Sequence, residues 1–204
     1  EQFIFIDGAI HKGLGPQADL ALIFGSPRNI NRKGLIKELK TEYPNACIFG
    51  CSTAGEIVST QVLDDSLTVT AVSFSSTKVK GATAMVNTPE DSYSAGIELA
   101  GALAAEGLRH VFVLSEGLNI NGTELVRGLQ DHLAPGVTLT GGLSADGDRF
   151  QETYIILNDN PVRNAVAAIG FYGNALRVGY GSFGGWDTFG PERLAFKRGR
   201  RRVS

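Results

Sequence analysis

An approximate repeat within the chain is the sequence feature that most constrains its fold. Segments of the second half resemble segments of the first half at a spacing of 90 or 91 residues. In chain order, the matching blocks are Asn29–Asn31 with Asn119–Asn121, Leu35–Leu39 with Leu125–Leu129, and Gly50–Ala54 with Gly141–Ala145. Self-similarity at a fixed period indicates duplicated structure. We therefore predict a domain at residues 1–192 with two similar halves, about 18–86 and 91–186, and then a basic tail or truncated junction at 193–204.

Each half is expected to begin with a strand, a helix and a second strand. Leu20–Phe24 and Val111–Leu114 are short, continuous apolar runs, which are typical of strands buried on both faces. The helices that follow should end near Tyr43 and Leu133, because a proline comes soon after each. Parallel strands joined by a helix normally form a right-handed crossover. The predicted fold class is α/β, a pseudo-twofold duplication of β-α-β plus extra strands, with mixed sheets flanked by helices.

Polar helix starts and further extended segments complete the predicted elements. Asn31 and Asn121 occupy the expected N-cap positions of the two helices, and Glu124 follows Asn121 at the spacing of a capping box. Thr88–Asp91 is typical of a third helix start, because a cap, a proline and two acids follow one another. Further strands are expected at residues 67–74, 78–85, 151–157, 164–171 and 176–182.

Charge and hydropathy exclude several classes of protein. Residues 193–204 hold six basic residues and no acid, which leaves 13 basic and 21 acidic residues in the other 192, a net charge of −8. Such a body is a poor nucleic-acid surface, because phosphate binding depends largely on charge neutralisation. No apolar run approaches the ~20 residues of a membrane helix, and no secretory signal is visible. The two cysteines, Cys47 and Cys51, are expected to be free thiols in a cytoplasmic protein.

The predicted binding site lies at the carboxyl ends of the parallel strands, where ligands collect in open α/β sheets. Four loops should meet there, and they carry mainly neutral hydrogen-bonding side chains. Free N–H groups at the helix starts would add affinity for an anion. This inventory suits a small polar molecule. The candidate ligand-binding residues are Ser26, Asn29, Asn31, Cys51, Ser52, Thr53, Asn119, Asn121, Ser144 and Asp146.

Catalysis and metal binding find less support in the sequence. A nucleophilic Cys51 would need a base, and none of the three histidines lies in the four loops. The pattern G-x-G-x-x-G at Gly179–Gly184 lacks the following helix and acid of a dinucleotide site. Five acids have no spacing diagnostic of a metal site, so we predict none: Glu56, Asp64, Asp65, Asp146 and Asp148. One axial histidine would be enough for haem, which leaves His11, His110 and His132 as alternatives.

Several of these motifs together resemble the N-terminal FIST domain family. The resemblance covers roughly Ala18 to Arg193, and it is carried by Ala18–Ser26, Gly50–Glu56, Gly142–Gly147, Gly179–Trp186 and Phe189–Arg193. It implies an intracellular sensory module that binds small ligands such as amino acids and is linked to signalling domains. One subgroup resembles haem-based nitric-oxide sensors. Members usually continue into a C-terminal FIST domain, whereas this sequence ends in a basic segment.

We therefore expect a non-enzymatic, cytoplasmic sensory domain whose ligand is an amino acid or a small carboxylate. Its partner would be a signalling protein or a C-terminal FIST domain, with no nucleic acid or membrane involved. Ligand binding would shift one half of the chain against the other. The alternatives are a haem-binding nitric-oxide sensor and an enzyme with Cys51 as nucleophile.

Overall fold

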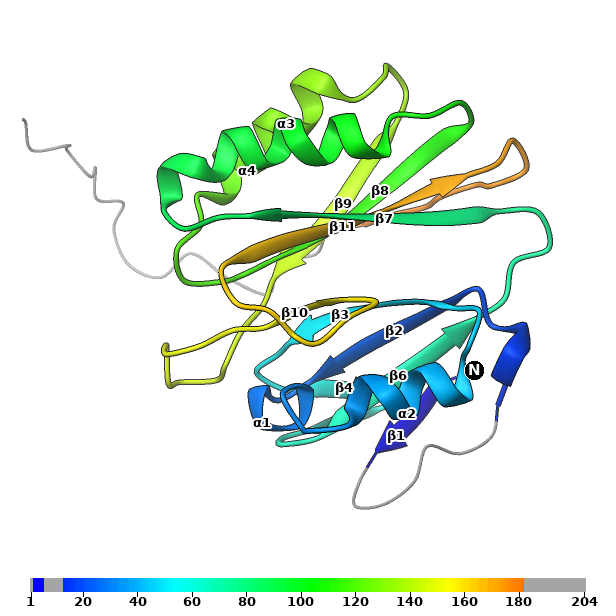
Figure 1. The fold of residues 1–204 in the computed structure, drawn as a ribbon, viewed down its shortest axis with the longest axis vertical. Coiled ribbons are helices and arrows are strands. Elements are labelled where there is room, and N and C mark those ends of the chain that lie inside the picture. The colour runs from blue at the N-terminus through cyan, green and yellow to red at the C-terminus, as the bar shows by residue number, and fades with distance from the viewer. Residues whose placement is uncertain (1, 6–12, 182–204) are drawn as a thin grey trace, which may run out of the picture.

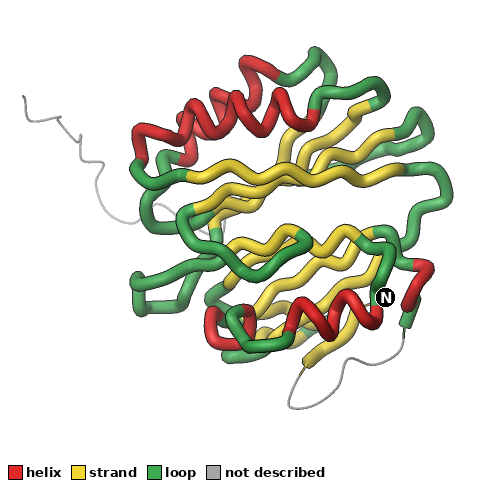
Figure 2. Tube along the Cα trace, in the orientation of Figure 1, coloured by secondary structure: helices red, strands yellow, loops and turns green. Residues whose placement is uncertain are grey.

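A computed structural model describes residues 2–5 and 13–181, which form four layers (Figure 1). Two β-sheets lie face to face, and helices cover both outer faces (Figure 2). The helices are α1 (Pro27–Ile30), α2 (Leu35–Glu42), α3 (Ser92–Leu103) and α4 (Gly122–His132), with short 3-10 turns at Gly15–Gln17 and Pro89–Asp91. α1 and α2 cover the first sheet, and α3 and α4 cover the second. The predicted class, α/β with mixed sheets flanked by helices, is confirmed.

The first sheet has the strand order β1-β6-β2-β3-β10. Its strands are β1 (Gln2–Phe5), β2 (Leu20–Gly25), β3 (Cys47–Ser52), β6 (Leu67–Val72) and β10 (Ile155–Leu157). β2 and β3 run parallel, as predicted, and the other neighbours are antiparallel. β10 comes from the second half of the sequence, so this sheet combines strands of both halves.

The second sheet has the order β7-β11-β8-β9 and also combines the two halves. Its strands are β7 (Lys78–Met85), β8 (Leu108–Ser115), β9 (Thr138–Leu143) and β11 (Ala165–Tyr172). β8 and β9 are parallel, and β11 runs antiparallel to both β8 and β7. Each sheet thus holds a parallel pair beside an antiparallel strand, while the duplication itself stays a prediction. A separate hairpin, β4 (Glu56–Val58) with β5 (Gln61–Leu63), follows β3.

The repeated glycines Gly50 and Gly141 lie inside the strands β3 and β9. Gly50 is opposite Ile23 in the first parallel pair, and Gly141 is opposite Val113 in the second. A Cβ atom at Gly50 would lie 1.9 Å from the Ile23 carbonyl oxygen, and one at Gly141 would lie 2.0 Å from the Val113 carbonyl oxygen. Because neither contact is physically possible, both positions require a residue without a side chain. The loops therefore begin later, at Thr53 and Ser144.

The helix predicted after Asn31 corresponds to α2, which starts later than predicted, at Leu35. The other helix starts agree more closely. Asn31 is not an N-cap but follows the short helix α1, which Ser26 and Pro27 begin. Gly34, with a φ of +91°, then precedes α2. Asn121 is the N-cap of α4, as predicted, and its side chain accepts the N–H of Glu124 at 3.2 Å.

Two strand predictions also changed. The strand expected at 151–157 begins only at Ile155, because the N–H groups of Gln151 and Glu152 donate to the Asp146 carboxylate instead of to a ladder. From Leu176 to Gly181, the described part of the segment expected at 176–182, no strand forms.

Three apolar clusters hold the layers together. One lies between the two sheets, where Phe49 of β3 meets Phe112 of β8 edge to face at 5.6 Å between ring centroids. The second joins α1 and α2 to the first sheet through residues such as Leu39, which is fully buried. The third joins α3 and α4 to the second sheet, with Leu99 and Leu129 at its centre.

Candidate functional site

Loops from both sheets meet at the carboxyl ends of the two parallel pairs, as the sequence predicted. Ala145, in the loop after β9, donates its N–H to the carbonyl oxygen of Ser52 at 2.9 Å. Ser144 in the same loop donates its N–H and its hydroxyl to the carbonyl oxygen of Ser115, at 2.7 and 2.9 Å. The loop after β9 is thus bonded to the last residue of a strand in each sheet.

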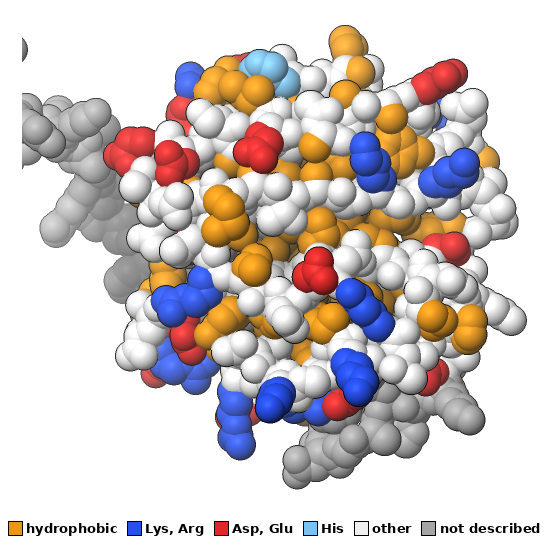
Figure 3. Space-filling view, in the orientation of Figure 1, with side chains coloured by type: hydrophobic (Ala, Val, Ile, Leu, Met, Phe, Trp, Pro, Cys, Tyr) orange, Lys and Arg blue, Asp and Glu red, His pale blue; other side chains and the backbone are white. Residues whose placement is uncertain are grey.

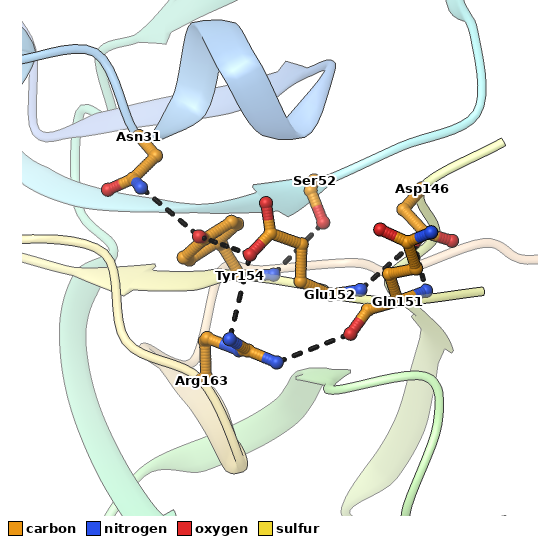
Figure 4. Close-up of polar contacts among 7 residues, drawn as sticks. All are labelled: Asn31, Ser52, Asp146, Gln151, Glu152, Tyr154 and Arg163. Carbon is orange, nitrogen blue, oxygen red and sulfur yellow. Dashed lines mark hydrogen bonds and ion pairs between the residues drawn. The ribbon is translucent and has the colours of Figure 1, made fainter. Parts of the chain in front are cut away.

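A hydrogen-bonded network fixes the segment that leads from this loop into β10 (Figure 4). The Ser52 hydroxyl accepts the N–H of Tyr154 at 3.0 Å. The Tyr154 hydroxyl accepts a bond from the Asn31 amide at 3.1 Å and donates to Glu152 at 2.9 Å. Arg163 approaches the same Glu152 carboxylate at 3.6 Å. Burial, with the bond to Glu152, raises the pKa of Tyr154, so its hydroxyl remains a donor at neutral pH.

Asp146 organises the turn between β9 and β10. Its carboxylate is buried and accepts the N–H groups of Phe150, Gln151 and Glu152 at 3.1, 2.6 and 3.0 Å. Burial alone would raise the pKa of Asp146, but these three donors and the nearby Arg149 hold it below its usual range. Asp146 therefore acts as a charged clamp on the loop, with both oxygens already engaged.

The loops after β2 and β8 are capped in corresponding ways. The buried Ser26 hydroxyl accepts the N–H of Asn29 at 3.4 Å, and the buried Glu116 carboxylate accepts the N–H groups of Leu118 and Asn119. The Asn29 amide also donates to the Asp65 carbonyl oxygen at 2.6 Å, which ties the first loop to the turn before β6. Ser26 and Asn29, which the sequence predicted as ligand-binding residues, therefore make contacts that stabilise the loops.

A cavity of about 280 Å³ lies among these loops, and we call it the loop cavity. Its lining residues are Ser26, Thr53, Ala54, Glu56, Asp64, Asp65, Gly147, Asp148 and Arg149. Glu56 is buried, and its carboxylate accepts the Thr53 hydroxyl at 2.5 Å and the N–H and hydroxyl of Ser66 at 3.1 and 2.5 Å. Asp64, Asp65, Asp148 and Arg149 are exposed. No hydrogen bond or ion pair engages these four side chains within the described part of the chain.

The loop cavity includes two of the ten predicted site residues, Ser26 and Thr53. Asn29 lies in α1 and Asn31 directly follows it, whereas Asn119 and Asn121 lie between β8 and α4. These asparagines make the contacts described above. Ser52, Ser144 and Asp146 are buried and do not line the cavity, and their hydrogen bonds connect the loops. Ligand contact by these residues stays a prediction. The charged side chains of the lining were missed as ligand groups, although Asp148 and Arg149 directly follow the motif Gly142–Gly147.

Cys51 is not placed to bind a ligand or to act as a nucleophile. Its side chain is buried in the apolar cluster between the sheets, which also contains Phe49 and Leu114. Burial raises the pKa of the Cys51 thiol to about 12. Because the thiolate is the reactive form, this thiol is inert at neutral pH. Its inclusion among the site residues was therefore wrong, and the reading as a Cys51 enzyme loses its chemical basis.

The described histidines do not fit an axial haem ligand. His110 is buried beside a largely apolar cavity of about 440 Å³, with Phe171 at 5.8 Å between ring centroids. Its two ring nitrogens lie 2.7 and 2.9 Å from the hydroxyls of Thr138 and Thr140, so neither offers a free lone pair to iron. Burial lowers the pKa of His110, which keeps the ring neutral. His132 is exposed and bonds the Gly128 carbonyl oxygen, and His11 lies outside the described residues.

The remaining observations concern metal-binding groups, helix hydropathy and surface charge. Across residues 2–5 and 13–181, no three His, Cys, Asp or Glu side chains are grouped so that they could hold a metal ion. Among the same residues, no helix has the length and apolar character needed to cross a membrane. On the face shown in Figure 3, acidic and basic side chains are interspersed. The G-x-G-x-x-G motif extends beyond the described residues, and the basic tail lies outside them.

The fold and the loop cavity define an α/β sandwich domain with a charged pocket at its strand ends. Comparison with protein families gives this class a name. The model of the FIST N domain matches residues 19–204, so the chain belongs to the FIST family. FIST domains are sensory domains of signal transduction. No curated protein matches the chain at a significant level.

Proposed function

We propose that this sensory domain binds a free amino acid in the loop cavity. The observation that carries the proposal is the charge pattern of the lining, where three exposed carboxylates share one small space with the guanidinium of Arg149. A zwitterion presents an ammonium group to Asp64, Asp65 or Asp148 and a carboxylate to Arg149. Charge-assisted hydrogen bonds of this kind are the stronger ones in proteins.

The same pattern favours an amino acid over a simple carboxylate. With Glu56 included, the lining carries four acids and one base, a formal charge of −3. This net negative charge would repel a ligand that carries only a negative charge, whereas it would attract the ammonium group of an amino acid. The volume of about 280 Å³ lies near the lower end for ligand pockets, which suits a molecule of amino-acid size.

The location of the cavity suggests how ligand binding would produce a signal. Its lining combines the loops after β2 and β3 of the first sheet with the loop after β9 of the second. A bound amino acid would bridge these loops and favour one arrangement of them, and only such a preference can transmit a signal. The receiver would be a signalling protein or a C-terminal FIST domain, in the cytoplasm that the free thiols Cys47 and Cys51 suit.

Isothermal titration with a panel of free amino acids tests the proposal. At least one should bind, and Arg149→Ala should weaken it by about tenfold or more, because a charge-assisted bond is lost. Arg177→Ala, an exposed arginine outside the cavity lining, is the matched control and should leave affinity unchanged. If no amino acid bound, or if the two arginine variants behaved alike, the assignment would be wrong.

A further inference from the structure

The two sheets share one strand arrangement and differ at one edge. In the first sheet, β3 lies between its parallel neighbour β2 and the antiparallel strand β10. β9 holds the corresponding place in the second sheet, because it is parallel to β8, yet within residues 2–5 and 13–181 it pairs with β8 alone. The strands Cys47–Ser52 and Thr138–Leu143 also lie at the repeat spacing of 91 residues. In this part of the chain, β9 therefore has an open edge, the β9 edge, where β3 has a neighbouring strand.

The β9 edge differs in exposure and composition from the other strands at comparable places. Five of the six residues of β3 are buried, whereas none of β9 is, and Leu143 is 55% exposed. β7, at the opposite edge of the same sheet, carries Lys78 and Lys80, but β9 contains no charged residue and no proline. Because charged residues and prolines commonly keep edge strands from pairing, the β9 edge is able to accept another strand.

The bonds that β3 makes identify the backbone groups available at the β9 edge. Ser52 of β3 donates its N–H to the carbonyl oxygen of Tyr154, just before β10, at 2.9 Å. Leu143 takes the place of Ser52 in β9. The next residue, Ser144, donates its N–H to Ser115 of β8, and successive residues of a strand direct their backbone groups to opposite sides. The N–H of Leu143 therefore faces the β9 edge.

Two cavities lie beside this edge, one on each face of β9. The first, of about 200 Å³, is here called the α4 cavity, and its walls include Leu125 of α4 and Leu139 of β9, which pack on the helix side of the sheet. The second, the cavity of about 440 Å³ described above, is here called the aromatic cavity, because Phe112 and Phe171 line it from the space between the sheets. Thr140 of β9 lines both. Among the described residues, neither lining contains an acid, a lysine or an arginine.

A strand added at the β9 edge would place its side chains alternately in these two cavities. β10 shows the pattern, because Ile156 packs beneath α1 and α2, whereas Ile155 and Leu157 pack between the sheets. These three residues lie opposite Phe49–Cys51 of β3, which correspond to Thr140–Gly142 of β9. The middle side chain of an added segment would therefore enter the α4 cavity, and its two neighbours would enter the aromatic cavity. The occupant that fits is an extended segment with three consecutive apolar residues.

Other sources of such a strand fit less well than a partner protein. A second copy of β9 would bring threonine and glycine residues, which would not fill apolar walls. Among residues 182–204, the sequence has one run of three apolar residues, Leu194–Phe196. Its neighbours Arg193 and Lys197 alternate with the middle residue, so both cations would meet the apolar helix side, where an unpaired charge is costly. A segment of another protein meets the requirement without this cost.

We propose that the β9 edge binds an extended segment of a partner protein as an antiparallel fifth strand of the second sheet. The segment carries three consecutive apolar side chains. Backbone hydrogen bonds, such as the one from Leu143, supply affinity, and the two cavities supply specificity, as in other peptides that add to a sheet edge. The two cavities share no lining residue with the loop cavity, and the proposal does not rest on amino-acid binding.

Amide NMR and hydrogen exchange of the full chain test the proposal. The probe is a short peptide that carries the β10 triplet, isoleucine-isoleucine-leucine, between threonines, with a lysine at each end for solubility. The signals of Gly141 and Leu143 should shift in a saturable way, and exchange of the Leu143 N–H should slow by about tenfold or more at saturation. The same peptide with aspartate as the middle residue should bind about tenfold more weakly or worse, because a charge would enter an apolar cavity. Absence of a saturable shift at millimolar peptide would overturn the proposal.

Two matched variants locate the binding. Gly142→Lys adds a charge to the edge strand where a Cβ meets no atom within 4 Å, so it should weaken peptide binding by about tenfold or more while the fold stays intact. Gly101→Lys makes the same change at an exposed glycine of α3 that also has no atom within 4 Å of a Cβ, and it should leave binding unchanged. Equal binding by the two variants would overturn the location.

Hydrogen exchange of the chain without peptide separates the other occupants. The Leu143 N–H should exchange quickly, because the β9 edge is open. Slow exchange that did not depend on protein concentration would overturn the proposal in favour of a segment of the same chain. Slow exchange that appeared only as the concentration rose would overturn it in favour of a second copy.

Discussion

Removing the charge of Asp146 tests whether its carboxylate stabilises the loop between β9 and β10. The carboxylate is 2% exposed and accepts three backbone N–H groups, one at Oδ1 and two at Oδ2. In Asp146→Asn, one oxygen becomes an NH₂ group, which must face at least one of these donors. A hydrogen bond to a charged group contributes ~1.5–3 kcal/mol, so the free energy of unfolding should fall by about 2 kcal/mol.

Thermal unfolding followed by circular dichroism gives the measurement. For a domain of this size, about 2 kcal/mol corresponds to a decrease of roughly 4–8 °C in the midpoint. Asp148→Asn is the matched control, because Asp148 lies in the same loop, is exposed and makes no hydrogen bond among the described residues. It should stay within ~0.5 kcal/mol of the native chain. If both variants unfolded at the same temperature, the clamp would not hold the loop.

The clamp also predicts a pH dependence with a definite sign. Burial opposes ionisation of Asp146, but its N–H donors and Arg149 lower the pKa overall. A carboxyl with a lowered folded-state pKa contributes stability that is fully present above its unfolded pKa, ~3.9, and is lost as the pH falls through the folded value. The difference in the free energy of unfolding between the native chain and Asp146→Asn should therefore be constant near neutrality and shrink below about pH 4. A difference that grew on acidification would contradict this sign.

Three further predictions concern the frame around the site. Gly50→Ala and Gly141→Ala should each destabilise the fold by ~1–3 kcal/mol or more in chemical denaturation, because their Cβ atoms would clash with carbonyl oxygens. Gly142→Ala, whose Cβ would meet no atom within 4 Å, should be close to neutral. The Cys51 thiol, with a pKa of about 12, should resist alkylation at neutral pH until the chain unfolds, as mass spectrometry can show. Glu56→Ala should cost about 2 kcal/mol in the same denaturation assay, because buried Ser66 donors lose their acceptor.

Local patterns in the sequence were sufficient to predict the elements and where their loops meet. The apolar runs gave β2 and β8, and the proline stops gave the ends of α2 and α4 within one residue. Because both first strands are parallel to the strand after the helix, their loops had to meet at one end of each sheet. These inferences depended only on neighbours in sequence, which is why they held.

Contacts between distant residues were not predictable in the same way. Nothing in β10 indicates that it pairs with β3, a hundred residues earlier in the chain, or that β7 joins the second sheet. Structural contacts of the predicted site residues were missed for the same reason, since Ser52 bonds Tyr154, which is far away in the sequence.

The exchange of strands between the halves limits how this sensory domain can move. The sequence suggested that a ligand would shift one half against the other. Such a shift would break the ladder of β10 with β3 and the eight-residue ladder of β7 with β11. β3, β10 and β11 in these ladders are largely buried, so sliding within the ladders is strongly disfavoured. The parts free to respond are the loops that line the cavity, between the Asp146 clamp and the turn at Asp64 and Asp65. A ligand-induced signal from this domain should therefore begin as a rearrangement of these loops at the junction of two intact sheets.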